Sequence, residues 1–263
     1  CSSDLEEPLC KDDGEVKDRL NNVADGFLMH ERPILNRIDD SVCFFSAGQM
    51  RTIRRARGYA PAPLILTKRS KPLLACGSFY KNTFCLLQDE YAFLSQHIGD
   101  LDNALTFHYY KEEIQKYKKL FNVSPKWIAK DMHPGYISSI YADELGMPVI
   151  AVQHHHAHIA SVMAEHNIED KVIGIAYDGT GMGIDGNIWG AEFLLADFKG
   201  FQRVVQLNYV PLPGGDAAIK HPFRAALGFI YPEADYFTEY INRIGQDMSD
   251  IIFKQIRQKF KIG

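Results

Sequence analysis

The sequence lacks the marks of a disulfide-bonded, membrane-spanning or nucleic-acid-binding protein. Its five cysteines are odd in number and no two of them have C-x-x-C spacing, which disfavours a disulfide framework or a zinc knuckle. No apolar run approaches the length of a membrane span, and no basic-then-apolar leader opens the chain. A net charge of -4 gives no general affinity for nucleic acid or membrane surfaces. We therefore expect a cytoplasmic protein with reduced thiols that binds neither.

The chain has 263 residues, 46% of them hydrophobic, and can form one large domain or two ordinary ones. It opens on Cys1 instead of Met and closes on Gly263 without tapering off, so we expect a piece of a longer polypeptide. Helical spacing of apolar residues predicts an amphipathic helix over 11–30. The stretch 58–63 holds a glycine and two prolines that break regular structure. We therefore place a boundary there and predict two domains, 1–65 and 66–263.

The second of these domains has a regular order of predicted elements. The predicted strands cover residues 72–76, 83–87, 91–96, 127–129, 148–152, 172–177, 188–196 and 201–209. The predicted helices cover residues 103–121, 136–145 and 155–166. This α/β order matches the duplicated ribonuclease-H-like fold of actin, Hsp70 and the sugar kinases, with its first half and the opening strands of its second half present. In that fold two hairpins face each other across a cleft that holds the phosphates of a nucleotide.

Four of the ten histidines fall within residues 154–158. On a helix, His154 and His158 share one face a turn apart and can bind one metal ion. Asp178 ends a predicted strand and supplies a third ligand if that strand runs parallel to, and beside, the strand before the histidines. Imidazole with carboxylate favours iron or zinc over calcium. The alternative is a solvated polar face, and His155 and His156 are as well explained by capping or solvent contact as by contact with a substrate.

Glycines at two hairpin corners suggest a phosphate site. Gly179, Thr180 and Gly181 can bring backbone N–H groups and a hydroxyl close to a phosphate, although the same string is common in a plain hairpin turn. At the matching corner of the first hairpin, Lys81, Asn82 and Thr83 offer a cation, an amide and a hydroxyl to a phosphate. The alternative is an ordinary exposed loop. The later string Asp185-Gly186-Asn187 is expected to be a structural turn.

Each of three further groups of residues has two possible interpretations. The turn that contains Gly214 and Gly215 either shapes the cleft wall or connects a strand to a helix expected near Ala217. Polar residues at two strand ends are active-site candidates or helix caps. They are His97, Asp100, Asp131 and His133. An arginine-rich stretch either forms a charged surface or binds phosphate or carboxylate. It contains Arg32, Arg37, Arg54, Arg55 and Arg57.

Taken together, these strings resemble the HypF carbamoyltransferase family, which matures nickel–iron hydrogenases. The matching strings, in chain order, are His30-Glu31-Arg32-Pro33-Ile34, Arg37, Asp39-Asp40-Ser41-Val42, Arg54-Arg55-Ala56-Arg57-Gly58-Tyr59-Ala60-Pro61, Lys81-Asn82-Thr83-Phe84-Cys85-Leu86, Ser95-Gln96-His97-Ile98-Gly99-Asp100-Leu101, Val152 to Ile159, Asp178 to Gly183, Ile188-Trp189-Gly190 and Pro211 to Asp216. Such a series in order is more specific than any single string.

The resemblance implies that residues 1–65 end a YrdC-like domain and that residues 66–263 begin a TsaD-like domain. In the family, carbamoyl phosphate is hydrolysed and its carbamate is adenylated with ATP, for which we expect Mg. The carbamoyl group of the adenylate then passes to the C-terminal cysteine of a HypE partner, where dehydration yields cyanide. By the same resemblance, the metal held by His154, His158 and Asp178 contacts the adenylate phosphate and acts as a Lewis acid.

The remaining candidate residues are assigned with the help of the resemblance. The catalytic candidates are Lys81, Asn82, His97 and Asp100. The candidates for cofactor binding are Thr83, Gly179, Thr180, Gly181, Gly214 and Gly215 in the TsaD-like part and Arg32, Arg37, Arg54 and Arg55 on the YrdC-like side, where the adenylate forms.

The sequence departs from the family pattern in several places, and these departures leave other functions open. It has no acylphosphatase module and no paired C-x-x-C motifs, and a further metal-binding aspartate and the adenine pocket would lie beyond Gly263. Rival enzymes are an O-carbamoyltransferase that acts on small molecules and a tRNA threonylcarbamoyl-transferring enzyme, which the charge balance disfavours. A rival of another class is a non-catalytic metal-binding or HypE-docking module.

Overall fold

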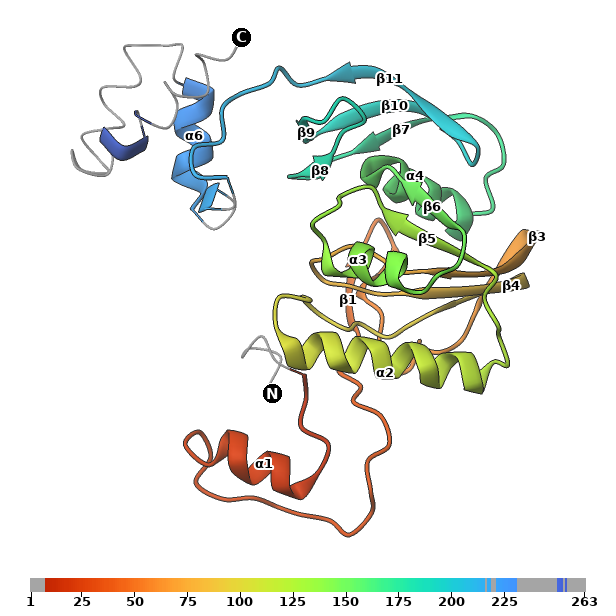
Figure 1. Cartoon of the computed structure of the whole chain (residues 1–263), viewed down its shortest axis with the longest axis vertical. Coiled ribbons are helices and arrows are strands. Elements are labelled where there is room, and N and C mark those ends of the chain that lie inside the picture. The colour runs from red at the N-terminus through yellow and green to blue at the C-terminus, as the bar shows by residue number, and fades with distance from the viewer. Residues whose placement is uncertain (1–7, 216, 219–220, 231–249, 253, 255–263) are drawn as a thin grey trace.

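The computed structural model describes residues 8–215, 217–218, 221–230, 250–252 and 254, and they form two main β-sheets with a helix between them and two small two-stranded sheets (Figure 1). The sheet formed early in the chain has the strand order β4-β3-β5-β6, and we call it the first sheet. The sheet formed later has the order β11-β10-β7, and we call it the second sheet. None of the helices in this part of the chain is long and apolar enough to cross a membrane.

The first sheet is built from one long hairpin and two parallel strands. β3 (Leu64–Ala75) pairs antiparallel with β4 (Cys85–Leu94), and β5 (Trp127–Asp131) and β6 (Val149–Val152) follow in parallel. The prediction of separate strands at 83–87 and 91–96 is wrong, because β4 runs through both. Asp89 has a φ of 55° where the pairing register shifts, so the chain bulges there instead of turning.

Two helices pack against this sheet and bury its core. α2 (Ala104–Leu120) begins where the side chain of Asn103 accepts a hydrogen bond from the backbone N–H of Thr106, and α3 (Ile137–Glu144) follows β5. The prediction of a helix over 103–121 is confirmed within a residue at each end. The largest fully buried side chains here come from β3, β4, α2 and β5. They include Leu74, Leu86, Tyr110, Ile114 and Ile128.

The second sheet is antiparallel throughout. β7 (Val172–Ala176) pairs with β10 (Glu192–Asp197), which pairs with β11 (Gly200–Gln206). The predicted strand 188–196 is in fact two, because β9 (Ile188–Trp189) forms a small ribbon with β8 (Gly181–Met182) before β10 begins. The turn at Asp185-Gly186-Asn187 closes that ribbon, as expected, with the N–H of Gly183 bonded to the carbonyl of Asn187.

Helix α4 (His154–Glu165) connects the two sheets. The expectation that β6 and β7 are parallel neighbours is wrong, since they belong to different sheets. Instead, α4 packs on β7 and β10, with Ile159 and Met163 in a cluster with Leu194 and Ala196. Gly174 of β7 permits this close packing, because a Cβ there would lie 2.4 Å from Cδ1 of Ile159.

The segment before β3 lies against α2. Helix α1 (Asp13–Leu20) is shorter than the predicted 11–30, and the hairpin of β1 (Val42–Ser46) and β2 (Gln49–Arg54) follows it. The hydroxyl of Tyr109 on α2 donates to the carbonyl of Arg37. Ala217 and Ala218 are helical, as expected, although residues 216, 219 and 220 lie outside the described part. Helix α6 (Pro222–Ile230) follows.

Replacing Gly174 by alanine is expected to lower the free energy of unfolding by about 1–3 kcal/mol, because the added methyl overpacks the contact with Ile159. Chemical denaturation measures the effect. Gly200→Ala in β11 is the control, since a Cβ there meets nothing within 4 Å. Equal stability of the two variants would show that this contact is not tight.

Candidate metal centre

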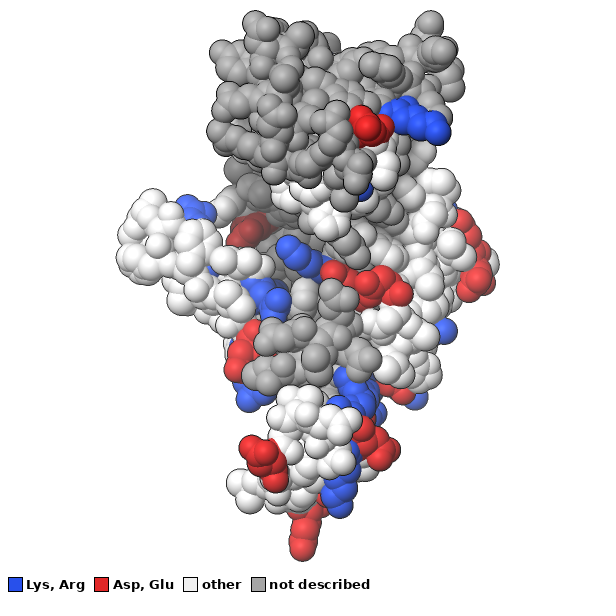
Figure 2. Space-filling view, turned by 90° about the vertical axis from the view of Figure 1, so that its left-hand side faces the viewer, with Lys and Arg blue, Asp and Glu red and all other residues white. Residues whose placement is uncertain are grey.

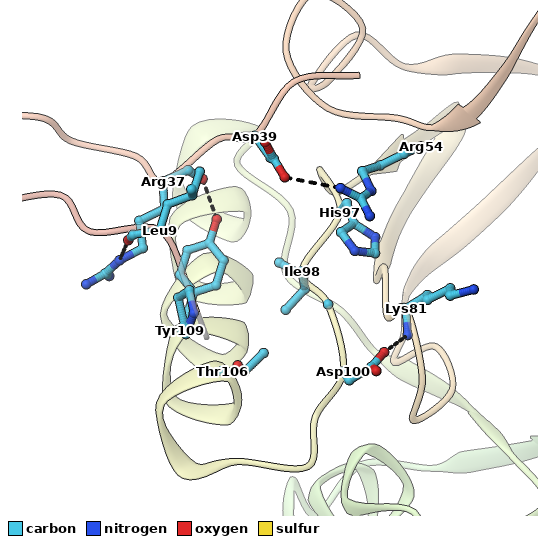
Figure 3. Close-up of a pocket in the computed structure, with 12 residues that line it drawn as sticks. Leu9, Arg37, Asp39, Arg54, Lys81, His97, Ile98, Asp100, Thr106 and Tyr109 are labelled. Carbon is cyan, nitrogen blue, oxygen red and sulfur yellow. Dashed lines mark hydrogen bonds and ion pairs between the residues drawn. The ribbon is translucent and has the colours of Figure 1, made fainter. Parts of the chain in front are cut away.

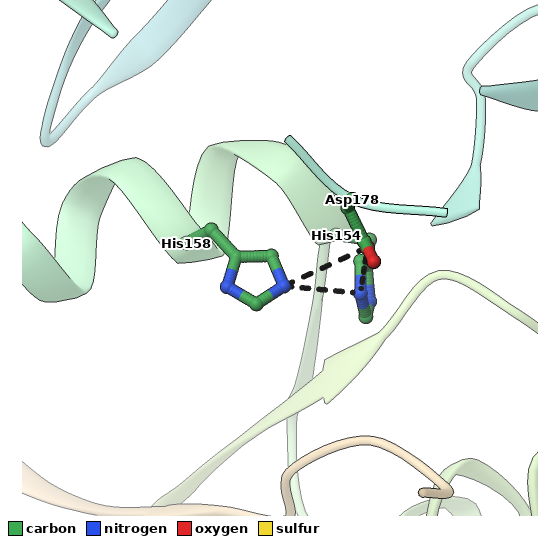
Figure 4. A group of neighbouring side chains, drawn as sticks. All are labelled: His154, His158 and Asp178. Carbon is green, nitrogen blue, oxygen red and sulfur yellow. Dashed lines mark hydrogen bonds and ion pairs between the residues drawn. The ribbon is translucent and has the colours of Figure 1, made fainter. Parts of the chain in front are cut away.

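Three side chains meet at the N-terminal end of α4 (Figure 4). His154 and His158 lie one turn apart on this helix, and Asp178 follows the end of β7. Oδ2 of Asp178 lies 2.8 Å from Nε2 of His154 and 3.7 Å from Nε2 of His158. The two imidazole nitrogens are 3.3 Å apart. The structure therefore brings together the three residues that the sequence predicts to share a metal ion.

The spacing and chemistry of these atoms suit a divalent cation. Metal–ligand bonds of about 2.1 Å place neighbouring ligands about 3.0 Å apart in octahedral and about 3.4 Å apart in tetrahedral geometry. The three ligand atoms all lie within 4.8 Å of one another. Two imidazoles with one carboxylate form a donor set typical of iron or zinc. The residues present therefore fit a transition metal.

Asp131, at the end of β5, fixes the orientation of His154. Its Oδ2 lies 2.6 Å from Nδ1 of His154, and its Oδ1 accepts a hydrogen bond from the backbone N–H of His133. Asp131 is almost fully buried. A proton held on Nδ1 leaves the lone pair of Nε2 free for a cation, the arrangement common for histidine ligands.

The two carboxylates change the pKa of the groups around them. The hydrogen bonds of Asp131 and then Asp178 raise the pKa of His154 to about 9. Burial by itself would raise the pKa of Asp178, but the hydrogen bonds of His154 and His158 outweigh it and hold that pKa well below its usual range. Without a metal, His154 therefore carries a proton, and its positive charge lies where a metal cation would bind.

Two residues lie behind this group: Gln153, which the sequence pattern did not single out, and His155, for which solvent contact was one expectation. The side chain of Gln153 caps α4 by accepting from the N–H of His156, and its amide nitrogen donates to the carbonyl of Met182 in the loop after Asp178. His155 is fully buried, with Nε2 lying 4.0 Å from Oδ2 of Asp178. His156 lies elsewhere, with Nε2 near the carbonyl of Asp197. The cap at Gln153 could have been read from its place before the histidine helix.

The loop of residues 178–181 follows the metal group closely. The backbone N–H of Gly179 donates to Oδ1 of its neighbour Asp178. Gly181 packs against the helix, because a Cβ on it would lie 2.6 Å from Cε1 of His155 and 2.9 Å from Cβ of His154. The glycine therefore lets the loop reach the N-terminus of α4.

A cavity of about 370 Å³ adjoins this loop. Thr180 and Gly215, two of the predicted cofactor-binding residues, line it, while Gly214 lies beside it at a φ of 90°. One wall is aromatic, since the rings of His133 and Tyr136 stack at 4.1 Å. The cavity offers a planar apolar wall, a hydroxyl and loop backbone to a ligand next to the metal group.

Most of the other predicted residues line a separate pocket of about 180 Å³ between the N-terminal segment and α2 (Figure 3). They are Arg37, Arg54, Lys81, His97 and Asp100. Arg54 is paired with Asp39 at 3.2 Å, and the N–H of Lys81 donates to Asp100. Burial lowers the pKa of His97, and the positive charge of the nearby Arg54 lowers it further.

The remaining predicted residues have mainly structural contacts. The guanidinium of Arg37 bonds to the carbonyl of Leu9 and to Glu15, and that of Arg55 bonds to the carbonyls of Tyr59 and Ala62. Asn82 is buried and donates to the carbonyls of Cys76 and Ser78. Thr83 follows it, half-buried, and Arg32 is exposed. The structure thus places Thr180 and Gly215 in one pocket and Lys81, His97, Asp100, Arg37 and Arg54 in another.

Comparison with known proteins identifies the family. A model described as the HypF Kae1-like domain matches residues 68–165, and a model described as the second subdomain of the carbamoyltransferase Kae1-like domain matches residues 174–262. The chain belongs to the HypF carbamoyltransferase family. The two matches correspond to the two sheets, and the fold expected from the sequence is confirmed.

Individual relatives agree with this assignment. Carbamoyltransferase HypF of Synechocystis is 43% identical over 96% of this chain and 36% of its own length, and carbamoyltransferase HypF2 of Cupriavidus necator is 44% identical over 86% and 29%. The chain thus spans about a third of the length of these HypF proteins.

Two solved structures have the same fold. A crystal structure of full-length HypF in a phosphate- and nucleotide-bound form superposes with a TM-score of 0.94 at 56% identity, covering 97% of this chain and 34% of that one. The HypF of T. kodakarensis superposes with a TM-score of 0.87 at 36% identity, covering 96% and 35%.

Metal binding by this HypF chain is expected to release a proton near neutral pH. The pKa of His154 is raised to about 9, so the metal-free site is protonated there and a cation must displace that proton. The apparent metal affinity should therefore rise with pH until about 9. Calorimetric titrations in two buffers of different protonation enthalpy count the protons. An affinity that does not change with pH would contradict this assignment.

Replacing Asp131 by alanine is expected to weaken metal binding about 10- to 100-fold, because His154 loses the acceptor that orients it. The affinity is measured by titration with Zn²⁺. Asp143→Ala is the matched control, since this carboxylate pairs with Lys130 at 2.6 Å and lies outside the metal group. A similar loss in both variants would mean that Asp131 has no special role.

Proposed function

We propose that this chain is the metal-binding part of a HypF-type enzyme that transfers a carbamoyl group. In this proposal the protein uses carbamoyl phosphate and ATP, forms carbamoyl adenylate, and passes the carbamoyl group to the C-terminal cysteine of a HypE-like acceptor for cyanide synthesis. The observation that carries the proposal is the meeting of His154, His158 and Asp178 beside a cavity of about 370 Å³. The family assignment supplies the class of reaction.

The residues of the chain would act by binding and orienting. His154 and His158 present nitrogen lone pairs, and Asp178 presents an oxygen, toward one point near the N-terminal end of α4. Thr180, two residues after Asp178, lines the cavity, and its hydroxyl with the backbone of residues 179–181 suits a phosphate. A bound iron or zinc ion would act there as a Lewis acid on the adenylate. The related full-length HypF, which binds phosphate and a nucleotide, supports a ligand of this class.

The pocket between the N-terminal segment and α2 would belong to adenylate formation, with Mg and ATP. Arg54, Lys81 and His97 place positive or polar groups there, and guanidinium groups bind phosphates in pairs of hydrogen bonds. Arg37 and Arg55 each bond to backbone carbonyls, whereas Arg54 has a single ion pair with Asp39, so Arg54 is the stronger candidate for contact with a ligand.

Among the described residues on the face shown in Figure 2, acidic and basic side chains are interspersed and form no uniformly basic surface. This supports a protein or small-molecule acceptor over tRNA. Carbamoyl transfer by the full-length protein to a HypE C-terminal peptide, to a small alcohol and to tRNA separates the three acceptor classes. Transfer to the peptide is expected. A chain that binds HypE without metal-dependent nucleotide binding would instead be a docking module.

Replacing His154 by alanine is expected to abolish metal binding and carbamoyl transfer while the fold remains intact. The metal content is measured directly, transfer is measured to the HypE peptide, and circular dichroism reports the fold. His166→Ala is the control, since this exposed histidine caps the other end of α4 through its backbone only. Full metal occupancy in the His154 variant would overturn the ligand assignment.

A further inference from the structure

A buried ring nitrogen behind the metal group, Nε2 of His155, has no hydrogen-bond partner among the described residues. It faces Oδ2 of Asp178, the oxygen that pairs with Nε2 of His154 at 2.8 Å. Nε2 of His155 and this oxygen lie 4.0 Å apart, which is about 1 Å too far for a hydrogen bond. The side chain of His155 has no exposed surface, so solvent does not satisfy this nitrogen. A buried donor without a partner is unfavourable.

The hydrogen bonds of Gln153 decide which nitrogen of His155 carries the proton. The side-chain oxygen of Gln153 accepts from the backbone N–H of His156 at 2.8 Å, which fixes the orientation of its amide group. The amide nitrogen, a donor, therefore faces Nδ1 of His155 at 3.0 Å. Nδ1 must accept, so the proton of His155 is on Nε2 and points toward Asp178.

Among the described residues, the surroundings of His155 offer no better acceptor. The nearby buried carboxylate, Glu192, is already bound by Nε and Nη2 of Arg203, each at 2.6 Å. The indole of Trp189 is an apolar neighbour, with ring centroids 6.1 Å apart. Gly181 closes the remaining side, since its Cα packs on the imidazole.

We propose that His155 is a positioning residue that donates a hydrogen bond from Nε2 to Oδ2 of Asp178 when this oxygen binds the metal. The inference rests on the proposed metal site and adds a residue to it. A carboxylate oxygen has two lone pairs, so it can bind a cation and accept from His155 together. Asp178 sits at the start of a glycine-rich loop, where its side chain needs such a restraint.

The test compares two substitutions in the full chain, titrated with Zn²⁺ alone. His155→Phe keeps the ring but removes the donor, and we expect the affinity to fall about 10- to 100-fold. His155→Gln retains an N–H of similar reach, and we expect the affinity to stay within about threefold of the original. Thermal unfolding without metal should not be lowered in the Phe variant, because it removes an unpaired buried donor.

Each outcome has a distinct meaning. Unchanged affinity in the Phe variant, or an equal loss in the Phe and Gln variants, would overturn the role of His155 and leave the metal site standing. Failure of the original chain to bind Zn²⁺ would overturn the metal site together with this inference.

A second measurement needs no variant. In ¹⁵N-histidine-labelled protein, Zn²⁺ should move the Nε2–H signal of His155 downfield and slow its exchange with water. A proton found on Nδ1 would overturn the proposal.

Discussion

The side chain of Gln153 is the contact on which the arrangement of the site depends. Its oxygen caps α4, and its amide nitrogen bonds both to the carbonyl of Met182 and to the ring of His155. One amide thus fixes the start of the histidine helix, the loop that carries Asp178 and the tautomer of a buried imidazole. Because the group is almost fully buried, loss of any of these bonds would leave an unsatisfied polar atom.

Around this amide, the two sheets contribute different parts of the site. The first sheet supplies Asp131 at the end of β5, and the second supplies Asp178 after β7. α4 lies between them and presents His154 to both carboxylates at once, at 2.6 and 2.8 Å. A cation at this point would therefore link the two halves of the fold. The pKa of His154, which the two carboxylates raise to about 9, reflects the same preference for positive charge at this point.

The separation of the candidate residues into two pockets suggests a division of labour within the chain. The metal group belongs to α4 and to Asp178 after β7, and the larger cavity is lined by residues 79–80, 133–136 and 180–215. The smaller pocket belongs to the N-terminal segment together with Lys81, His97 and Asp100. The two pockets come close together in the chain at Lys81. This residue lines the smaller pocket with Asp100, and the residues just before it, Phe79 and Tyr80, line the larger cavity. The boundary predicted at 58–63 stays a prediction.

The sequence by itself predicted most of the elements and the pair of candidate metal ligands on one helix, because both depend on short-range spacing. The helix over 103–121 follows from its cap and periodicity, and the pairing of His154 with His158 follows from the helical repeat. Long-range relations were decided by the tertiary structure. Asp178 approaches the histidines through the packing of Gly174 on Ile159 and not through parallel strands. Likewise, His155 is buried beside Asp178 because one particular side of α4 faces the second sheet. The way in which a helix packs between two sheets depends on contacts far apart in the chain, and a single sequence does not specify them.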